Sequence, residues 1–185
     1  LHARMNEEGG LKKKLFDAAL ETAERRKQLA AEGKRSAWLD FKFKVLDGLV
    51  FSKVRERFGG RLKYAFSGGA AISKEVAEFI DNLGITVYEG YGLSETSPIA
   101  TMNYPGARKI GSVGKPIPGV EIEIDVSATE DPTQGEVLIY GHNIMEGYHN
   151  LDEANAEVLV EKGGRRGFRS GDMGLIDDEE QAHGF

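Results

Sequence analysis

Two short apolar segments that each lead into a glycine-rich loop constrain the fold of this chain more than any other feature. Residues 61–67 alternate apolar and polar side chains and lead into Gly68-Gly69-Ala70, and residues 85–88 lead into a loop at 89–92. The residues between them, 73–83, have the apolar spacing of a helix that begins at a serine cap. A strand–helix–strand unit with a right-handed parallel crossover is therefore expected.

The two loops are expected to face one crevice, because parallel strands end at the same edge of a sheet and open α/β sheets bind ligands there. Residues 88–98 contain two glycines, two tyrosines, two carboxylates and three hydroxyls. Gly90 and Gly92 allow close approach of the backbone to a ligand, and Tyr91 offers a flat ring. Ser94 and Glu95 suit a phosphate and its metal ion. A polar strand-to-loop turn without a ligand remains the alternative.

The fold class expected is α/β, with the strand–helix–strand part of a parallel sheet preceded by a helical hairpin and followed by a small antiparallel β-subdomain. We expect a helical segment at 1–60, an α/β nucleotide-binding part at 61–105 and a β-rich subdomain at 106–185. The second helix of the hairpin, at 36–58, is expected to begin at the N-cap Ser36. It is expected to bury an apolar stripe made of Trp38, Phe41, Val45, Leu49 and Phe58. In the last part we expect strands at 120–126 and 137–140, a helix at 150–160, a basic turn at 163–167 and an irregular polar segment at 168–172.

Composition excludes several functions. The 185 residues contain no Cys and carry a net charge of -6, so thiolate chemistry is absent and general nucleic-acid binding is not expected. The four histidines lack metal-ligand spacing. Residues 92–96 fail the Gly-x-Ser-x-Gly pattern of serine hydrolases, and no Walker loop or complete Gly-x-Gly-x-x-Gly pattern is present. The basic runs at 12–14 and 25–27 favour a solvated helix face, with contact to anionic lipid or to a phosphate-bearing partner as the alternative.

Six stretches, in order, resemble the adenylate-forming acyl-CoA synthetases, especially the long-chain fatty-acid–CoA ligases. They are Ser67-Gly-Gly-Ala70, Tyr91-Gly-Leu-Ser-Glu-Thr-Ser-Pro98, Gly111-Ser-Val-Gly-Lys-Pro-Ile-Pro-Gly119, Gly135-Glu136, Gly147-Tyr148-His-Asn150 and Phe168-Arg-Ser-Gly-Asp172. One such stretch would be weak, but six in order are specific. The resemblance covers the chain from about residue 65 onward.

The resemblance implies a reaction and a set of roles. Members join a carboxylate to the α-phosphate of ATP, release pyrophosphate and pass the acyl group to the thiol of coenzyme A. By similarity Tyr91 stacks on adenine, Ser94 bonds the α-phosphate, Glu95 holds Mg²⁺ and Asp172 takes the ribose hydroxyls, with Ser94 and Glu95 as the catalytic pair. The nucleotide-binding set implied is Gly68, Gly69, Ala70, Glu89, Gly90, Tyr91, Gly92, Ser94 and Asp172. The implied substrates are a fatty acid, ATP and coenzyme A.

The chain departs from the family pattern at five places, one of which is the stretch Gly163 to Arg166, which looks longer than usual. Ser94 and Ser170 stand where the family usually has Thr, and Gly167 stands where it usually has Trp. The Thr that commonly follows the Gly-Tyr-x-Asn turn is replaced near Asn155. The family's phosphate loop and C-terminal lysine are not in the chain, so we expect an excerpt of a longer protein that makes no acyl-CoA by itself.

Several alternatives stay open at this point. A synthetase that delivers its acyl-adenylate to a carrier protein and a non-catalytic nucleotide-binding module are compatible with the same motifs. The sequence does not indicate the length of the acid or the oligomeric state. We expect a cytoplasmic protein, with peripheral membrane contact as an open question.

Overall fold

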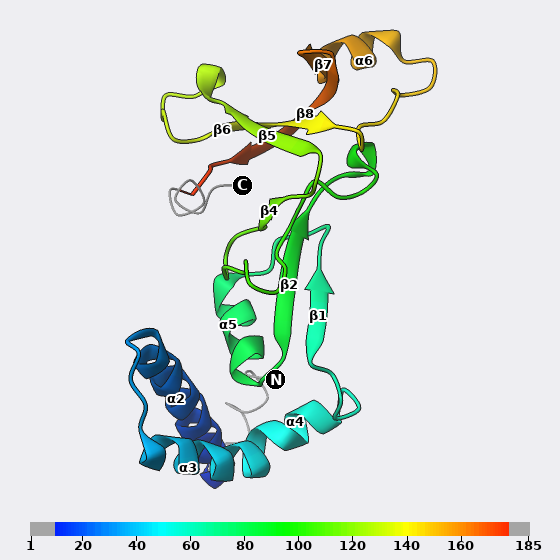
Figure 1. The fold of residues 1–185 in the computed structure, drawn as a ribbon. Coiled ribbons are helices and arrows are strands. Elements are labelled where there is room, and N and C mark those ends of the chain that lie inside the picture. Colours follow the sequence, from blue (N-terminus) through cyan, green and yellow to red (C-terminus); the bar gives the residue numbers. More distant parts are fainter. Residues whose placement is uncertain (1–9, 178–185) are drawn as a thin grey trace. The chain divides into compact units, whose positions relative to one another are not determined.

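The computed structural model describes residues 10–177, which form two compact units (Figure 1). Within the described part, unit 1 contains residues 10–65 and 72–87, and unit 2 contains residues 66–71 and 88–177. The division falls inside two strands, β1 (Tyr64–Ser67) and β2 (Thr86–Tyr91). Each unit is described separately below.

Unit 1 is helical, and serine side chains begin two of its helices. The Oγ of Ser36 accepts a 3.4 Å hydrogen bond from the backbone of Leu39, and the Oγ of Ser73 accepts one of 3.3 Å from Val76. Both serines are N-caps, as predicted from the sequence. The elements are α2 (Leu11–Ala31), α3 (Ala37–Leu46), a π-helical turn (Asp47–Phe51), α4 (Ser52–Glu56) and α5 (Lys74–Asn82).

A bidentate ion pair links three of these elements. The two terminal nitrogens of Arg55 each donate a 2.7 Å hydrogen bond to the carboxylate of Asp47, and Nη1 also donates to the carbonyl of Leu83. The hydrogen bond to Asp47 is the main reason that the pKa of Arg55 is raised. The apolar core beside it is formed by Ala19, Ala23, Leu46, Phe51 and Leu83.

The stripe predicted to be buried in the second helix is instead exposed. Trp38 is 70% exposed and Phe41 61% exposed, and Val45, Leu49 and Phe58 are exposed as well. The helix has apolar residues on both sides, and it packs against α2 through the side that carries Leu46 and Phe51. Spacing alone does not select between two apolar faces.

The first sheet has the strand order β1-β2-β3-β4, with β3 at Thr101–Met102 and β4 at Lys115–Pro116. It contains one parallel pair, β1 with β2, which confirms the predicted strand–helix–strand crossover. The other two pairs are antiparallel, so the sheet is mixed.

The second sheet lies in unit 2, is fully antiparallel and has the order β5-β6-β8-β7. Its strands are β5 (Val120–Asp125), β6 (Gly135–Gly141), β7 (Leu159–Lys162) and β8 (Arg165–Gly174), and α6 (Asp152–Val158) precedes β7. A short 3-10 turn, Val126–Ala128, follows β5. The buried core of this unit is formed by Ala100, Val120, Val137, Ile139, Ile144 and Phe168.

The prediction for residues 159–172 was wrong. The expected basic turn and irregular polar segment are a β-hairpin, in which Lys162 pairs with Arg165 across Gly163 and Gly164. Both glycines have positive φ, 57° and 76°, which is the requirement of the two-residue turn that matches strand twist. The expected helix is shorter for the same reason, since β7 begins at Leu159.

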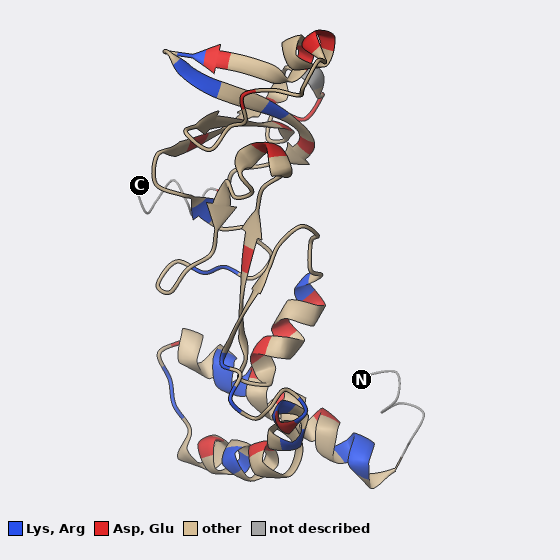
Figure 2. Cartoon of the chain, turned by 90° about the vertical axis from the view of Figure 1, so that its right-hand side faces the viewer, with Lys and Arg blue, Asp and Glu red and all other residues tan. Residues whose placement is uncertain are grey.

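Lys and Arg as well as Asp and Glu residues occur along the helices of unit 1 (Figure 2). Lys13 pairs with Asp17 at 2.8 Å, and Lys27 pairs with Asp81. Two of the basic residues of α2 therefore have carboxylate partners within the unit. Among residues 10–177, no helix combines the length and apolar character that crossing a membrane requires.

Candidate functional site

The candidate site begins where β2 ends. This strand continues three residues beyond the predicted end at residue 88, so Gly90 and Tyr91 are strand residues that pair with Met102 and Thr101. A Cβ on Gly68 would lie 3.6 Å from the carbonyl oxygen of Gly90. The glycine loops after β1 and in β2 therefore lie side by side, as the parallel topology predicted.

The loop after β2 folds back on itself at Gly92. A Cβ at this position would lie 2.1 Å from the carbonyl oxygen of Pro98, which is far inside van der Waals contact. The intervening residues form a 3-10 turn, Ser94–Thr96, and Ser97 has a positive φ of 55°. Glycine at position 92 is thus a steric requirement of the turn that carries Ser94 and Glu95.

Residues after β6 hold this turn in place. The side-chain amide of Asn143 donates to the carbonyls of Thr96 at 3.1 Å and Ile99 at 2.7 Å. The backbone N–H of Met145 donates to the carbonyl of Glu95 at 2.9 Å. Asn143 and Thr96 are both buried, so these bonds are shielded from water and the turn has a defined position.

The two catalytic candidates in the turn differ in their contacts. The Oε1 of Glu95 accepts a 2.8 Å hydrogen bond from the hydroxyl of Tyr148, and this bond is the first cause of a raised pKa of Tyr148. Ser94 is exposed, and its hydroxyl has no hydrogen-bond partner among the residues that the structure describes. The side chain of Glu89 has no such partner there either, whereas its carbonyl accepts from the backbone of Asn103 at 2.8 Å.

Asp172 lies on an irregularity of the second sheet. Glu136 pairs with Met173 and Leu138 with Arg169, so two residue steps on β6 oppose four on β8. Such a bulge re-aims side chains, and the Oδ2 of Asp172 accepts a 2.7 Å hydrogen bond from the hydroxyl of Tyr91. The structure thus brings together two of the predicted site residues.

Two of the surrounding side chains stabilise the bulge. Glu136 accepts a 3.0 Å hydrogen bond from the backbone N–H of Gly171, which has a positive φ of 71°, and forms an ion pair with Arg169. The hydroxyl of Ser170 donates to the carbonyl of Val137 at 2.7 Å and accepts from the backbone of Asp172 at 3.1 Å. The Ser at position 170 therefore supplies hydrogen bonds that hold Asp172.

Tyr91 and Asp172 line a cavity of about 410 Å³. Its other walls include the turn at 111–114 and the apolar side chains of Ile122 and Ile124. Burial raises the pKa of Tyr91 to about 12, with a further contribution from Asp172. The phenol is therefore a hydrogen-bond donor at neutral pH.

The other predicted site residues do not line this cavity. They are Gly68, Gly69, Ala70, Glu89, Gly90, Gly92, Ser94 and Glu95. Sequence reasoning also gave no role to Tyr148 or to the turn at 111–114, although both belong to the stretches that carry the family resemblance. Their positions depend on long-range contacts that no local pattern encodes.

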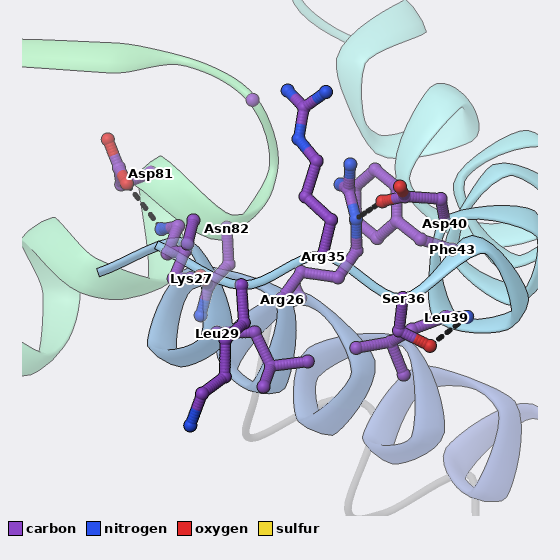
Figure 3. Close-up of a pocket in the computed structure, with 14 residues that line it drawn as sticks. Arg26, Lys27, Leu29, Arg35, Ser36, Leu39, Asp40, Phe43, Asp81 and Asn82 are labelled. Carbon is purple, nitrogen blue, oxygen red and sulfur yellow. Dashed lines mark hydrogen bonds and ion pairs between the residues drawn. The ribbon is translucent and has the colours of Figure 1, made fainter. Parts of the chain in front are cut away.

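A second cavity, of about 400 Å³, lies within unit 1 (Figure 3). Arg26 pairs with Asp40 at 2.7 Å and lies 4.2 Å from the ring centroid of Phe43, while Lys27 pairs with Asp81. Its charged side chains are thus largely paired with one another. None of the predicted site residues lines it.

Comparison with known proteins identifies the family. The model of the AMP-binding enzyme family matches residues 13–149. A long-chain-fatty-acid–CoA ligase, FadD15 of Mycobacterium bovis, is 33% identical over 96% of this chain and 28% of its own length. The chain therefore belongs to the AMP-binding enzyme family, the adenylate-forming enzymes that include the acyl-CoA synthetases.

Solved structures agree with this assignment. The crystal structure of a long-chain-fatty-acid–CoA ligase from Archaeoglobus fulgidus has a TM-score of 0.56 and 26% identity, and the match covers 64% of this chain and 27% of that one. The O-succinylbenzoate–CoA synthetase of Bacillus subtilis, solved in complex with ATP and magnesium ion, has a TM-score of 0.52 and 29% identity over 63% and 24% of the two chains. The chain thus spans about a quarter of the length of the relatives it matches.

Proposed function

We propose that this chain is the central nucleotide-binding part of a fatty-acid–CoA ligase. The whole enzyme would join a fatty acid to the α-phosphate of ATP, release pyrophosphate and transfer the acyl group to coenzyme A. The observation that carries the proposal is the 2.7 Å hydrogen bond between Tyr91 and Asp172 beside a cavity of about 410 Å³. It joins two motif residues of an AMP-binding enzyme at a place that suits a nucleoside.

The nucleoside would be held by one ring and one carboxylate. Tyr91 offers its ring to the adenine, and its hydroxyl is already directed to Asp172. Asp172 keeps Oδ1 as an acceptor for the ribose hydroxyls, and hydrogen bonds to an ionised carboxylate are the stronger kind. The neighbouring loops, Gly68-Gly69-Ala70 and residues 89–92, would contribute backbone contacts.

The phosphates would lie at the turn that carries Ser94 and Glu95. The Ser94 hydroxyl has no partner among the described residues and is exposed, so it is available to the α-phosphate. Glu95 uses Oε1 for Tyr148, which leaves Oε2 for a cation. Among residues 10–177 there is no cluster of three or more His, Cys, Asp or Glu side chains that would hold a metal alone.

This donor set fits Mg²⁺, which is often held by one or two carboxylates together with substrate phosphates and water. When bound, the ion would neutralise charge on the phosphate oxygens during adenylation. The chain's own residues position the reactants and fix the carboxylate. The acyl-adenylate is an activated acyl donor, so the second step requires no protein nucleophile.

The test is acid-dependent exchange of pyrophosphate into ATP by the full-length protein, across fatty acids of different length. Glu95→Ala should lower the exchange rate by at least about a hundredfold, and Asp172→Ala should lower it by about ten- to a hundredfold. Glu130→Ala is the matched control, because Glu130 is an exposed carboxylate outside the segments that contact Glu95 and Asp172. Exchange at the wild-type rate in both site variants would overturn the proposal, and formation of acyl-CoA from added coenzyme A would identify the acceptor.

A further inference from the structure

The hydrogen bond between Tyr148 and Glu95 joins two segments that lie 53 positions apart. The same segment contacts Glu95 a second time, since the backbone N–H of Met145 donates to the Glu95 carbonyl at 2.9 Å. Both the main chain and the side chain of Glu95 are thus fixed by residues 145–148. Tyr148 and Glu95 are each partly buried, so water competes less for this bond than at the open surface.

Tyr148 is itself held by a side chain. The Oδ1 of Asn155 accepts a 2.7 Å hydrogen bond from the Tyr148 backbone N–H, and its Nδ2 donates to the Tyr148 carbonyl at 2.9 Å. One amide therefore satisfies both backbone groups of the tyrosine. Asn155 lies on α6, near the place where the resemblance implies a Thr.

Gly147 makes this arrangement possible. It has a φ of 148°, and a Cβ at this position would lie 3.0 Å from Oδ1 and 3.1 Å from the other amide atoms of Asn155. A Cβ at position 147 would require the amide to shift by a few tenths of an ångström, and the positive φ also disfavours a side chain there. Gly147, Tyr148 and Asn155 therefore act as one unit whose outward contact is the carboxylate of Glu95.

We propose that Tyr148 is a positioning residue for the Glu95 carboxylate, and that Asn155 holds Tyr148 in place for this role. The inference rests on the proposed function and deepens it, because it concerns how Glu95 would be presented to a cation. The phenol occupies Oε1 and fixes the rotation of the carboxylate, so Oε2 is the oxygen directed to the metal. Hydrogen bonds of this kind to metal-binding carboxylates tune affinity for the ion.

The experiment measures binding of Mn²⁺ together with ATP to the full-length protein by electron paramagnetic resonance. Tyr148→Phe keeps the ring and removes only the hydroxyl, and we expect it to weaken Mn²⁺ binding by about tenfold. Asn155→Ala should weaken it in the same direction through loss of the support of Tyr148. Tyr104→Phe is the matched control, because it makes the same chemical change at an exposed position whose hydroxyl has no hydrogen-bond partner among the described residues.

A double-mutant cycle between Tyr148 and Glu95 distinguishes the positioning role of Tyr148 from a purely structural one. If Tyr148 acts through Glu95, Tyr148→Phe should have no further effect on Mn²⁺ binding in a Glu95→Gln background. Equal losses in both backgrounds, or wild-type Mn²⁺ affinity in Tyr148→Phe while Glu95→Gln loses it, would overturn the positioning role and leave the proposed function intact. Wild-type affinity in Glu95→Gln would overturn the metal assignment itself together with this role.

Discussion

The hydroxyl of Tyr91 donates a 2.7 Å hydrogen bond to Oδ2 of Asp172 across 81 positions of the sequence. Tyr91 is the last residue of β2, and Asp172 sits on the bulge of β8. The bond therefore depends on two features, namely the end of β2 at Tyr91 and the bulge of β8 that contains Asp172. It also leaves one oxygen of Asp172 and the face of the tyrosine ring for a ligand.

The first prediction distinguishes the role of Asp172 from that of the Tyr91 hydroxyl in binding ATP. Asp172→Ala should raise the KM for ATP by about ten- to a hundredfold, because a hydrogen bond to a charged group contributes about 1.5–3 kcal/mol and 1.4 kcal/mol is tenfold. Tyr91→Phe keeps the ring and should raise the KM for ATP by less than about tenfold. Steady-state kinetics of adenylation by the full-length protein measures both values. A larger loss in Tyr91→Phe than in Asp172→Ala would contradict these roles.

The second prediction concerns pH. The pKa of Tyr91 is raised to about 12, mainly by burial, against an ordinary value of about 10. The folded state therefore binds this proton more tightly than the unfolded state, so the resulting stability is present below about pH 10 and is lost as the pH rises through the folded pKa.

Tyrosinate absorbance measures this shift directly. The difference between the titration curves of the wild type and of Tyr91→Phe isolates the phenol of Tyr91 from the other five tyrosines. Its midpoint should lie near pH 12. A midpoint near that of an ordinary tyrosine would show that Tyr91 is not buried as described.

The third prediction tests the turn at Gly92. Gly92→Ala would place a methyl group 2.1 Å from one backbone atom and 2.7 Å from another, and neither can move without opening the turn. We expect a loss of about 1–3 kcal/mol or more of stability and loss of pyrophosphate exchange, because Glu95 is displaced.

Gly48→Ala is the control for this change. A Cβ at Gly48 meets nothing within 4 Å, and its φ is not positive, so alanine should be neutral or stabilising by about 0.5–1 kcal/mol. Thermal unfolding of the two variants and the wild type gives the comparison. A Gly92→Ala protein with wild-type stability and exchange would refute the steric requirement.

Local sequence patterns predicted part of the fold and part of the candidate site. The serine caps at positions 36 and 73, the parallel crossover and the proximity of the two glycine loops all follow from rules about single turns and strand ends. The family resemblance added Tyr91 and Asp172 to one site, and the structure brings them into contact.

Other features depend on contacts that local rules do not contain. The helix at 36–58 has two apolar sides, and only the position of α2 decides that Leu46 and Phe51 are buried and Trp38 is not. β8 was missed because its ten residues include three glycines and four charges, a composition that is unusual in strands. Tyr148 was missed because its contact with Glu95 spans 53 positions.

Gly167 is one of the positions at which the sequence departs from the pattern of the family it resembles, and the structure shows what occupies the space above it. It pairs across the sheet with Tyr140, and a Cβ at position 167 would lie 2.4 Å from Cδ1 of the Tyr140 ring. The ring is almost completely buried, so it occupies the space over the glycine. The Tyr140 ring of the neighbouring strand thus fills the space where the resemblance implies a Trp side chain.

The last prediction follows from the position of the Tyr140 ring over Gly167. Gly167→Trp should destabilise the protein strongly, because the new ring meets Tyr140, and overpacking of this kind costs about 1–3 kcal/mol. Tyr140→Ala should cost about 3–5 kcal/mol through the cavity it leaves. The double variant should lose less stability than the sum of the single losses, by about 0.5–3 kcal/mol, since residues in contact are coupled. Thermal unfolding of all four proteins measures the coupling, and additive losses would mean that the two positions do not share one space.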